Sequence, residues 1–201
     1  MTRGEWKAAA RTRLGGGIFK DQWLIGVVFC LVVSAIVGAA GGILPGIGAL
    51  VVTGPMFYAQ KYAFLAQARE GRTVDLNDAF IGFKNDFGGT LLIGLLSGLF
   101  IFLWSLLLFV PGIVKAYAYS LAYYVKADHP EYGWRECLDE SQRLMMGHKW
   151  EKFVLDLSFI GWSIVGSLCF GVGTLWVMAY MAATEAEYYK YLLSDRRAPE
   201  F

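Results

Sequence analysis

The chain has 201 residues, of which 56% are hydrophobic and 17% are charged, and its mean hydropathy is +0.45. Soluble domains usually carry about 25% charged residues, so this composition argues against an ordinary soluble domain. The charge deficit comes from long charge-free runs, which are typical of transmembrane helices. The formal net charge of +1 excludes a global basic field of the kind that recruits nucleic acid.

The first 22 residues are polar and basic, and they predict a short helix. Trp6, Ala9, Ala10 and Leu14 share one face at helical spacing, so we expect this helix to lie on a membrane surface. The basic start of the chain, followed by an apolar run, resembles a signal peptide. Its polar leader is long and amphipathic, however, and the rest of the chain is equally hydrophobic, so we expect no cleavage.

Six apolar runs follow, and breaker residues group them into three pairs. The runs are 23–40, 49–65, 89–110, 113–125, 150–170 and 174–193, and the breaks within the pairs are 41–48, 111–112 and 171–173. Some runs are shorter than the roughly 20 residues that cross a hydrocarbon core. Aromatic residues at the interface must therefore extend the ends of these spans. Gly54-Pro55 predicts a kink in the second run. We therefore predict an all-α, polytopic membrane protein with six transmembrane helices in three hairpins, forming one integral membrane domain over 1–201.

Two long polar segments, 66–88 and 126–149, carry amphipathic patterns. The predicted apolar faces are Leu76, Ala79, Phe80 and Phe83 in the first, and Trp134, Cys137, Leu138, Ser141, Leu144 and Met145 in the second. With the N-terminal segment, they predict three short interfacial helices.

The pattern of surface helix and hairpin recurs three times. Gly17-Ile-Phe-Lys, Gly82-Phe-Lys-Asn and Gly147-His-Lys-Trp fall at equal spacing, and we expect Gly147 to turn the chain into the following span. A fixed period indicates duplicated units, here 5–66, 75–127 and 134–193. Chance similarity among apolar segments is the alternative.

The distribution of basic residues predicts the orientation. The breaks at 41–48, 111–112 and 171–173 contain no Lys or Arg, and only Lys115 lies near that side, where we expect it to reach outward. The positive-inside rule then places both termini and both long polar segments in the cytoplasm. No segment on the outer side is long enough to build a site, which argues against a receptor or an extracellular enzyme.

Ionisable residues within the apolar runs are the functional candidates, because charges inside a bilayer are costly. At a rise of about 1.5 Å per residue, Glu185 and Glu187 lie roughly 17–20 Å from the start of the sixth run, near the cytoplasmic headgroups. The predicted ligand or ion cavity, open to the cytoplasm, consists of Lys61, Asp156, Glu185, Glu187 and Tyr123. In the alternative, the charged groups are partly hydrated and form ion pairs with Lys126, Lys152 or Lys190, and the tyrosine packs beside the interface.

We find no catalytic, metal or cofactor motif in context. GxSxG, HExxH, P-loop and dinucleotide patterns are missing, and His129 and His148 have no partner at metal-ligand spacing. Cys30, Cys137 and Cys169 form no CxxC pair, so we expect thiols packed as small hydrophobic groups. The sequence predicts a protein that is not an enzyme and holds neither a metal nor a cofactor.

Several segments of the C-terminal half resemble one family. They are Tyr119-Ser-Leu-Ala-Tyr-Tyr, Leu144-Met-Met-Gly-His-Lys, Leu157-Ser-Phe-Ile-Gly-Trp and Tyr188-Tyr-Lys-Tyr. This half of the chain is similar to the bacterial membrane proteins of domain-of-unknown-function family 975. The resemblance implies a polytopic plasma-membrane protein and no particular activity. The chain departs from that family at Asp156, where an apolar residue is expected, and at Glu185 and Glu187.

These observations favour a non-enzymatic component of the bacterial plasma membrane that acts through its cytoplasmic face. Its expected partners are membrane lipids and other membrane proteins, and not nucleic acid. The alternative is a small transporter, or a binder of lipid or another hydrophobic ligand, with a cavity open to the cytoplasmic leaflet.

Overall fold

The computed structural model describes residues 3–16, 21–43, 47–168 and 172–197, and every regular element in these ranges is a helix. The elements in chain order are α1 (Arg3–Arg13), α2 (Asp21–Ile43), α3 (Ile47–Glu70), the 3-10 helix η1 (Leu76–Phe80), α4 (Ile81–Lys84), α5 (Phe87–Leu107), α6 (Phe109–Tyr119), α7 (Ala122–Asp128), α8 (Trp134–Leu144), α9 (Lys149–Leu168) and α10 (Val172–Arg197). The predicted all-α class is confirmed.

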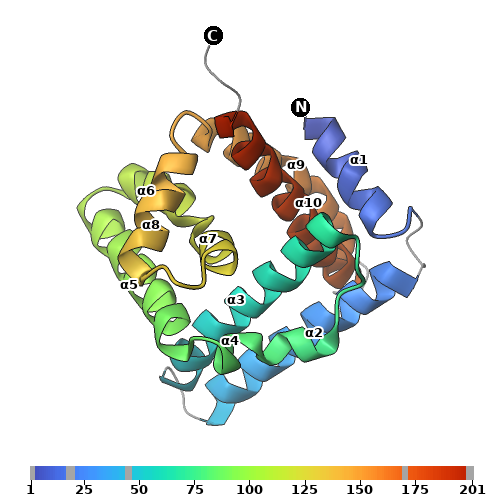
Figure 1. The fold of residues 1–201 in the computed structure, drawn as a ribbon, viewed down its shortest axis with the longest axis horizontal. Helices are drawn as coiled ribbons and strands as arrows, with labels where there is room; N and C mark the ends of the chain where they lie inside the picture. The colour runs from blue at the N-terminus through green and yellow to red at the C-terminus, as the bar shows by residue number, and fades with distance from the viewer. Residues whose placement is uncertain (1–2, 17–20, 44–46, 169–171, 198–201) are drawn as a thin grey trace.

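The long helices pack most extensively on their neighbours in the chain. The pairs are α2 with α3, α5 with α6, and α9 with α10. In Figure 1 these pairs surround the shorter helices α7 and α8, and α3 crosses the middle of the molecule. Because α3 contacts α2, α5, α7 and α10, it is the central helix of the bundle.

Two glycines allow other helices to approach α3 closely. A Cβ on Gly54 would lie 2.7 Å from the carbonyl oxygen of Thr90 on α5, and one on Gly82 would lie 2.3 Å from that of Pro55. Helix α3 continues through Pro55 as a single element. Gly82 is therefore a packing residue within α4.

Gly147 is a turn residue, as predicted. Its φ of 81° is a left-handed conformation that favours glycine, and it lies between α8 and α9. The corresponding step at Gly17 falls outside the residues that the structure describes.

The fourth apolar run differs from its prediction in two ways. The predicted break at 111–112 is wrong, because the chain turns at Leu108, which is extended with φ −157° and ψ 134°. Pro111 instead lies in the first turn of α6, where its missing N–H is not needed by the helix. The run is also not one helix, since α6 ends at Tyr119 and α7 begins at Ala122.

The interruption between α6 and α7 is bridged by a serine from α8. The Ser141 hydroxyl donates to the carbonyl of Ala118 at 2.7 Å and accepts from the N–H of Leu121 at 3.2 Å. All three residues are buried. Ser141 therefore supplies hydrogen bonds that a continuous helix would have made internally.

We expect Ser141→Ala to lower the free energy of unfolding by about 1–3 kcal/mol, because it leaves buried backbone groups without partners. The measurement is an SDS titration of the purified protein in mixed micelles. Ser194→Ala is the matched control, since the exposed Ser194 bonds only to the Tyr191 carbonyl in its own helix. Equal effects of the two substitutions would contradict this role.

The apolar faces of α1 and α8 were predicted correctly, but the bundle itself covers them. On α8, the buried residues include Cys137, Leu138, Ser141 and Leu144, and the helix packs on α5, α6 and α7. On α1, Trp6 is only 1% exposed, and it meets the rings of α10. The predicted contact of these two faces with a membrane surface is replaced by contact with protein.

The segment between α3 and α5 differs from α1 and α8 because most of its predicted apolar face is exposed. Of its predicted face only Ala79 is buried, while Leu76, Phe80 and Phe83 are exposed. The first part of the segment is the 3-10 helix η1, and the predicted face is therefore not carried by one continuous α-helix.

Two helices in the described ranges are long and apolar enough to cross a membrane. They are Asp21–Gly42 in α2 and Phe87–Leu107 in α5. In the α5 span only 11% of the most apolar window is buried by the rest of the chain, whereas the core helix of a soluble protein is mostly buried. The exposed side of α5 includes Leu92, Leu99 and Phe102.

Candidate functional site: a buried charge cluster

Helices α3, α9 and α10 bring four charged side chains together. The Lys152 ammonium lies 2.7 Å from Asp156 Oδ1 and 2.7 Å from Glu185 Oε1. The Lys61 ammonium forms an ion pair with the other oxygen of Glu185. We refer to Lys61, Lys152, Asp156 and Glu185 as the charge cluster.

Two helices supply three of the four charged groups. Lys152 and Asp156 are four residues apart on α9 and therefore share a face. Glu185 reaches from α10 and binds one lysine with each oxygen. Two positive and two negative charges alternate, so the cluster is neutral overall, and this pairing offsets the cost of removing its charges from water.

Access to the cluster is uneven. The Lys152 side chain is 2% exposed, whereas that of Asp156 is 29% exposed. The ring of Tyr124 lies 5.2 Å from the Lys61 ammonium. Tyr117 contacts Asp156. The cluster is therefore closed around Lys152 and most open at Asp156, and Tyr117 of α6 and Tyr124 of α7 line it with aromatic rings.

The structure separates the five residues of the predicted cavity. Lys61, Asp156 and Glu185 meet through Lys152. Glu187 instead forms ion pairs with Lys190 at 3.0 Å and with Arg13 at 3.5 Å.

Tyr123 also lies apart from the charge cluster. Its ring is 6.4 Å from that of Phe57. Its buried hydroxyl lies against Gly94 and has no hydrogen-bond partner in the described part of the chain. The tyrosine beside the cluster is the next residue, Tyr124.

The ion pairs agree in part with the alternative interpretation of the sequence. Lys152 pairs with two of the candidate carboxylates and Lys190 with a third. Lys126 pairs instead with Asp86 at 2.5 Å. Sequence reasoning considered Lys152 only as an interfacial partner. Its position four residues before Asp156 was the signal for the pair, but nothing in the sequence indicated the long-range contact with Glu185.

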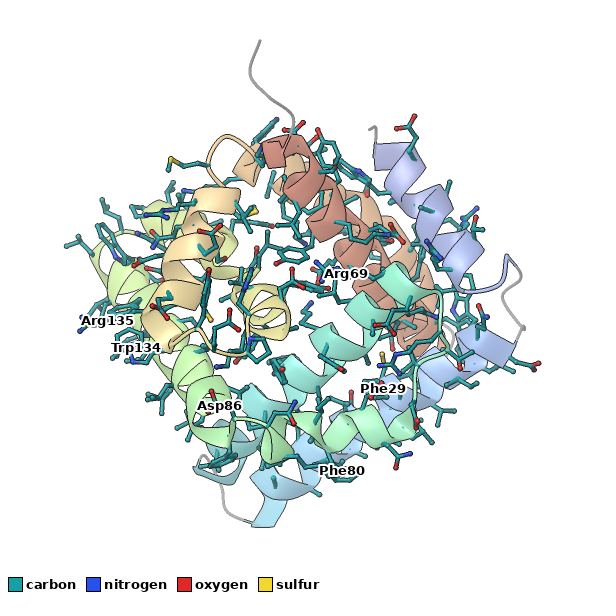
Figure 2. All side chains as sticks on the ribbon, viewed as in Figure 1. Phe29, Arg69, Phe80, Asp86, Trp134 and Arg135 are labelled. Atoms are coloured by element: carbon teal, nitrogen blue, oxygen red, sulfur yellow. The ribbon has the colours of Figure 1, made fainter. Side chains whose placement is uncertain are left out.

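A second polar contact was missed entirely. Arg69 at the end of α3 binds both oxygens of Asp128 at the end of α7, and Tyr189 of α10 donates to the same carboxylate at 2.8 Å. Figure 2 labels Arg69 where α3 approaches α10. These residues are far apart in the chain, and no local pattern links them.

Lys126 connects the segment before α8 with the start of α5. Its ammonium donates to the carbonyls of Pro130 and Tyr132, both at 2.8 Å, and pairs with Asp86. Asp86 also caps α5 by accepting from the N–H of Gly89 at 2.8 Å, and Figure 2 shows it at the start of that helix. The hydrogen bond from Lys126, with that from Gly89, lowers the pKa of the Asp86 carboxyl below its usual 3.8.

This lowered pKa predicts a pH dependence of stability. A carboxyl whose pKa is depressed by folding stabilises the protein above its unfolded pKa, and this stabilisation is lost as pH falls through the folded value. Asp86→Asn should therefore lower the free energy of unfolding at pH 7, on the order of 1 kcal/mol because Asp86 is partly exposed. The difference from the wild type should shrink below about pH 4. Chemical denaturation of both proteins at pH 7 and pH 3 measures it, and a difference independent of pH would contradict the ion pair.

Lys115 does not reach outward as predicted. Its ammonium donates to Gln142 of α8 at 3.0 Å, and it lies within 5.6 Å of the Trp104 and Tyr119 rings. The prediction was wrong because α8 packs beside α6 and offers an amide acceptor there.

Cys30 and Cys137 are free, buried thiols. Burial raises the pKa of Cys137 to about 11, so this side chain is a neutral thiol at pH 7. Cys169 lies outside the described residues. Among the residues described, no three or more His, Cys, Asp or Glu side chains are grouped so that they could hold a metal ion.

Comparison with known proteins gives one match. Residues 106–196 match the family described as "Protein of unknown function (DUF975)". This range includes Lys152, Asp156 and Glu185 but not Lys61, and the resemblance predicted from the C-terminal half is confirmed. No curated protein and no solved structure matches the chain.

Proposed function

We propose that this chain, a member of the DUF975 family through residues 106–196, is a multi-pass protein of the bacterial plasma membrane. In this proposal α2, α3, α5, α6 with α7, α9 and α10 are the six spans, and both termini are cytoplasmic. The exposed apolar side of α5 supports it, since water would not stabilise so large an apolar surface. Further exposed side chains such as Leu31, Ile160 and Trp162 extend this surface to α2 and α9.

The order of the elements supports the threefold repeat. A short helix precedes a hairpin in each of the units 5–66, 75–127 and 134–193: α1 before α2–α3, η1 with α4 before α5–α6, and α8 before α9–α10. In this proposal the shortness of α6 and the addition of α7 are a departure of the second unit from the other two.

We further propose that the protein is a non-enzymatic membrane component that acts through its cytoplasmic face on protein partners. The observation that carries this proposal is the packing of α1 and α8, whose apolar faces are held by the bundle. Their outer faces are therefore polar and fixed in place. On α8 this outer face includes Arg135, Glu136, Asp139 and Arg143, all exposed, and Figure 2 shows Trp134 and Arg135 at the outer edge of the molecule.

Photocrosslinking in native membranes tests this role. A photoreactive amino acid replaces Asp139 on the outer face of α8, and in a matched variant it replaces Leu106, which is exposed at the end of α5. We expect a discrete protein adduct from position 139 and lipid adducts alone from position 106. The proposal loses its basis if position 139 gives no protein adduct.

The charge cluster favours a second candidate, a small transporter or a binder of lipid or another hydrophobic ligand. Asp156 keeps the cluster partly open, and the adjacent α6–α7 segment is interrupted, as membrane helices often are at binding sites. Native mass spectrometry with phosphatidylethanolamine and phosphatidylglycerol tests it. We expect bound lipid on the wild type and severalfold less on Asp156→Leu. Equal retention of lipid by the two proteins would contradict this candidate.

A further inference from the structure

Of the three predicted surface helices, only the segment of η1 and α4 keeps an apolar face uncovered. The exposed fractions of Leu76, Phe80, Phe83 and Phe87 lie between 37% and 49%. These residues recur every three or four positions, and the Phe83 and Phe87 rings stack at 5.7 Å. We refer to these four residues as the aromatic stripe, and Figure 2 shows Phe80 at the outer edge of the molecule.

The opposite side of the segment is fixed to the bundle. Ala79 and Gly82 are buried, and Gly82 fits so closely against Pro55 of α3 that no side chain could be added there. The aromatic stripe cannot turn inward without breaking this contact. Its exposure is therefore a property of the packed segment.

The stripe continues directly into the exposed side of α5. Leu95 and Leu99 follow Phe87 along that helix, and both are exposed. Polar side chains that flank the stripe are exposed as well, namely Asn77, Lys84 and Asn85. Aromatic side chains among polar and basic ones are typical of the headgroup region of a bilayer, and uninterrupted leucines are typical of its hydrocarbon core.

We infer that the aromatic stripe inserts into the headgroup–acyl boundary of the cytoplasmic leaflet and fixes the depth at which α5 enters the membrane. The occupant of this surface is lipid, in contrast to α1 and α8, whose faces the bundle occupies. Lys84 lies beside the stripe, where its ammonium meets the lipid phosphates. This inference rests on the proposed membrane location of α5.

Spin-label accessibility tests the inference in the full-length protein. Single cysteines replace Phe80 and Phe83 in a chain whose native cysteines are alanine, and the protein is reconstituted in phosphatidylethanolamine–phosphatidylglycerol vesicles. Asn77→Cys and Asn85→Cys are the matched polar positions of the same segment. Leu95→Cys and Leu99→Cys report on α5. Collision of each nitroxide with oxygen and with a water-soluble nickel chelate is compared.

We expect the oxygen-to-nickel collision ratio at Phe80 and Phe83 to exceed that at Asn77 and Asn85 severalfold, and to be highest at Leu95 and Leu99. Nickel access at Phe80 and Phe83 equal to that at Asn77 would overturn the inference, and so would shielding from both reagents, which indicates a protein cover. In both cases low nickel access at Leu95 and Leu99 leaves the membrane proposal standing. Free nickel access at Leu95 and Leu99 would instead contradict the proposed membrane location itself.

Discussion

Lys152→Met is expected to lower the free energy of unfolding by about 3–5 kcal/mol, because it removes one partner of a buried ion-pair network. Lys152 is the only described residue that joins Asp156 to Glu185, and its side chain is 2% exposed. Without its ammonium, Asp156 has no cationic partner among the described residues, and Glu185 keeps its pair with Lys61. SDS titration in mixed micelles measures the loss.

Two further variants distinguish the effect of breaking the ion-pair network from the effect of removing any lysine. Lys84→Met removes an exposed lysine and should change stability by less than about 0.5 kcal/mol. The double variant Lys152→Met with Asp156→Leu leaves Lys61 and Glu185 as a balanced pair. It should therefore recover part of the stability lost in the single variant. A double variant at least as unstable as the sum of the single ones would contradict the coupling.

Trp6→Ala is expected to release α1 from the bundle. The Trp6 ring packs against Tyr188 at 4.8 Å and Tyr191 at 5.1 Å. Removing a buried tryptophan costs about 3–5 kcal/mol. Because α1 is a short terminal helix, we expect this loss to appear as local undocking. Limited trypsin digestion in detergent should then cleave rapidly after Arg11 and Arg13.

Trp6→Phe is the matched control. The indole N–H of Trp6 has no hydrogen-bond partner among the described residues, so phenylalanine keeps the aromatic packing and loses no hydrogen bond. We expect digestion of Trp6→Phe close to that of the wild type. If Trp6→Ala is cleaved no faster than Trp6→Phe, the ring does not hold α1 in place.

Helical periodicity predicted which faces are apolar, but not what covers them. Leu138 and Ser141 were placed correctly on the buried face of α8, and Trp6 on that of α1. The covering surface of α1 comes from the distant helix α10, and that of α8 comes from α5, α6 and α7, of which only α7 is its neighbour in the chain. A one-dimensional pattern carries no information on such tertiary contacts. The same limit explains Lys115, whose partner Gln142 is brought near only by tertiary packing.

The charge cluster was predicted in part for a related reason. Depth along a helix indicated that Lys61, Asp156 and Glu185 lie at a similar level, and the structure brings them together. Depth does not specify the direction in which a side chain points. Glu187 is only two residues after Glu185, so it leaves α10 on another side and meets Arg13 and Lys190.

Cysteine accessibility tests most directly whether the chain crosses the membrane with α8 on the cytoplasmic side. Leu108→Cys reports on the exposed turn between α5 and α6, and Asp139→Cys reports on the exposed face of α8. Each is made in a chain whose native cysteines are alanine, and spheroplasts are treated with a membrane-impermeant maleimide. We predict labelling of Leu108→Cys in intact spheroplasts and of Asp139→Cys only after lysis. Labelling of both residues only after lysis would contradict the account.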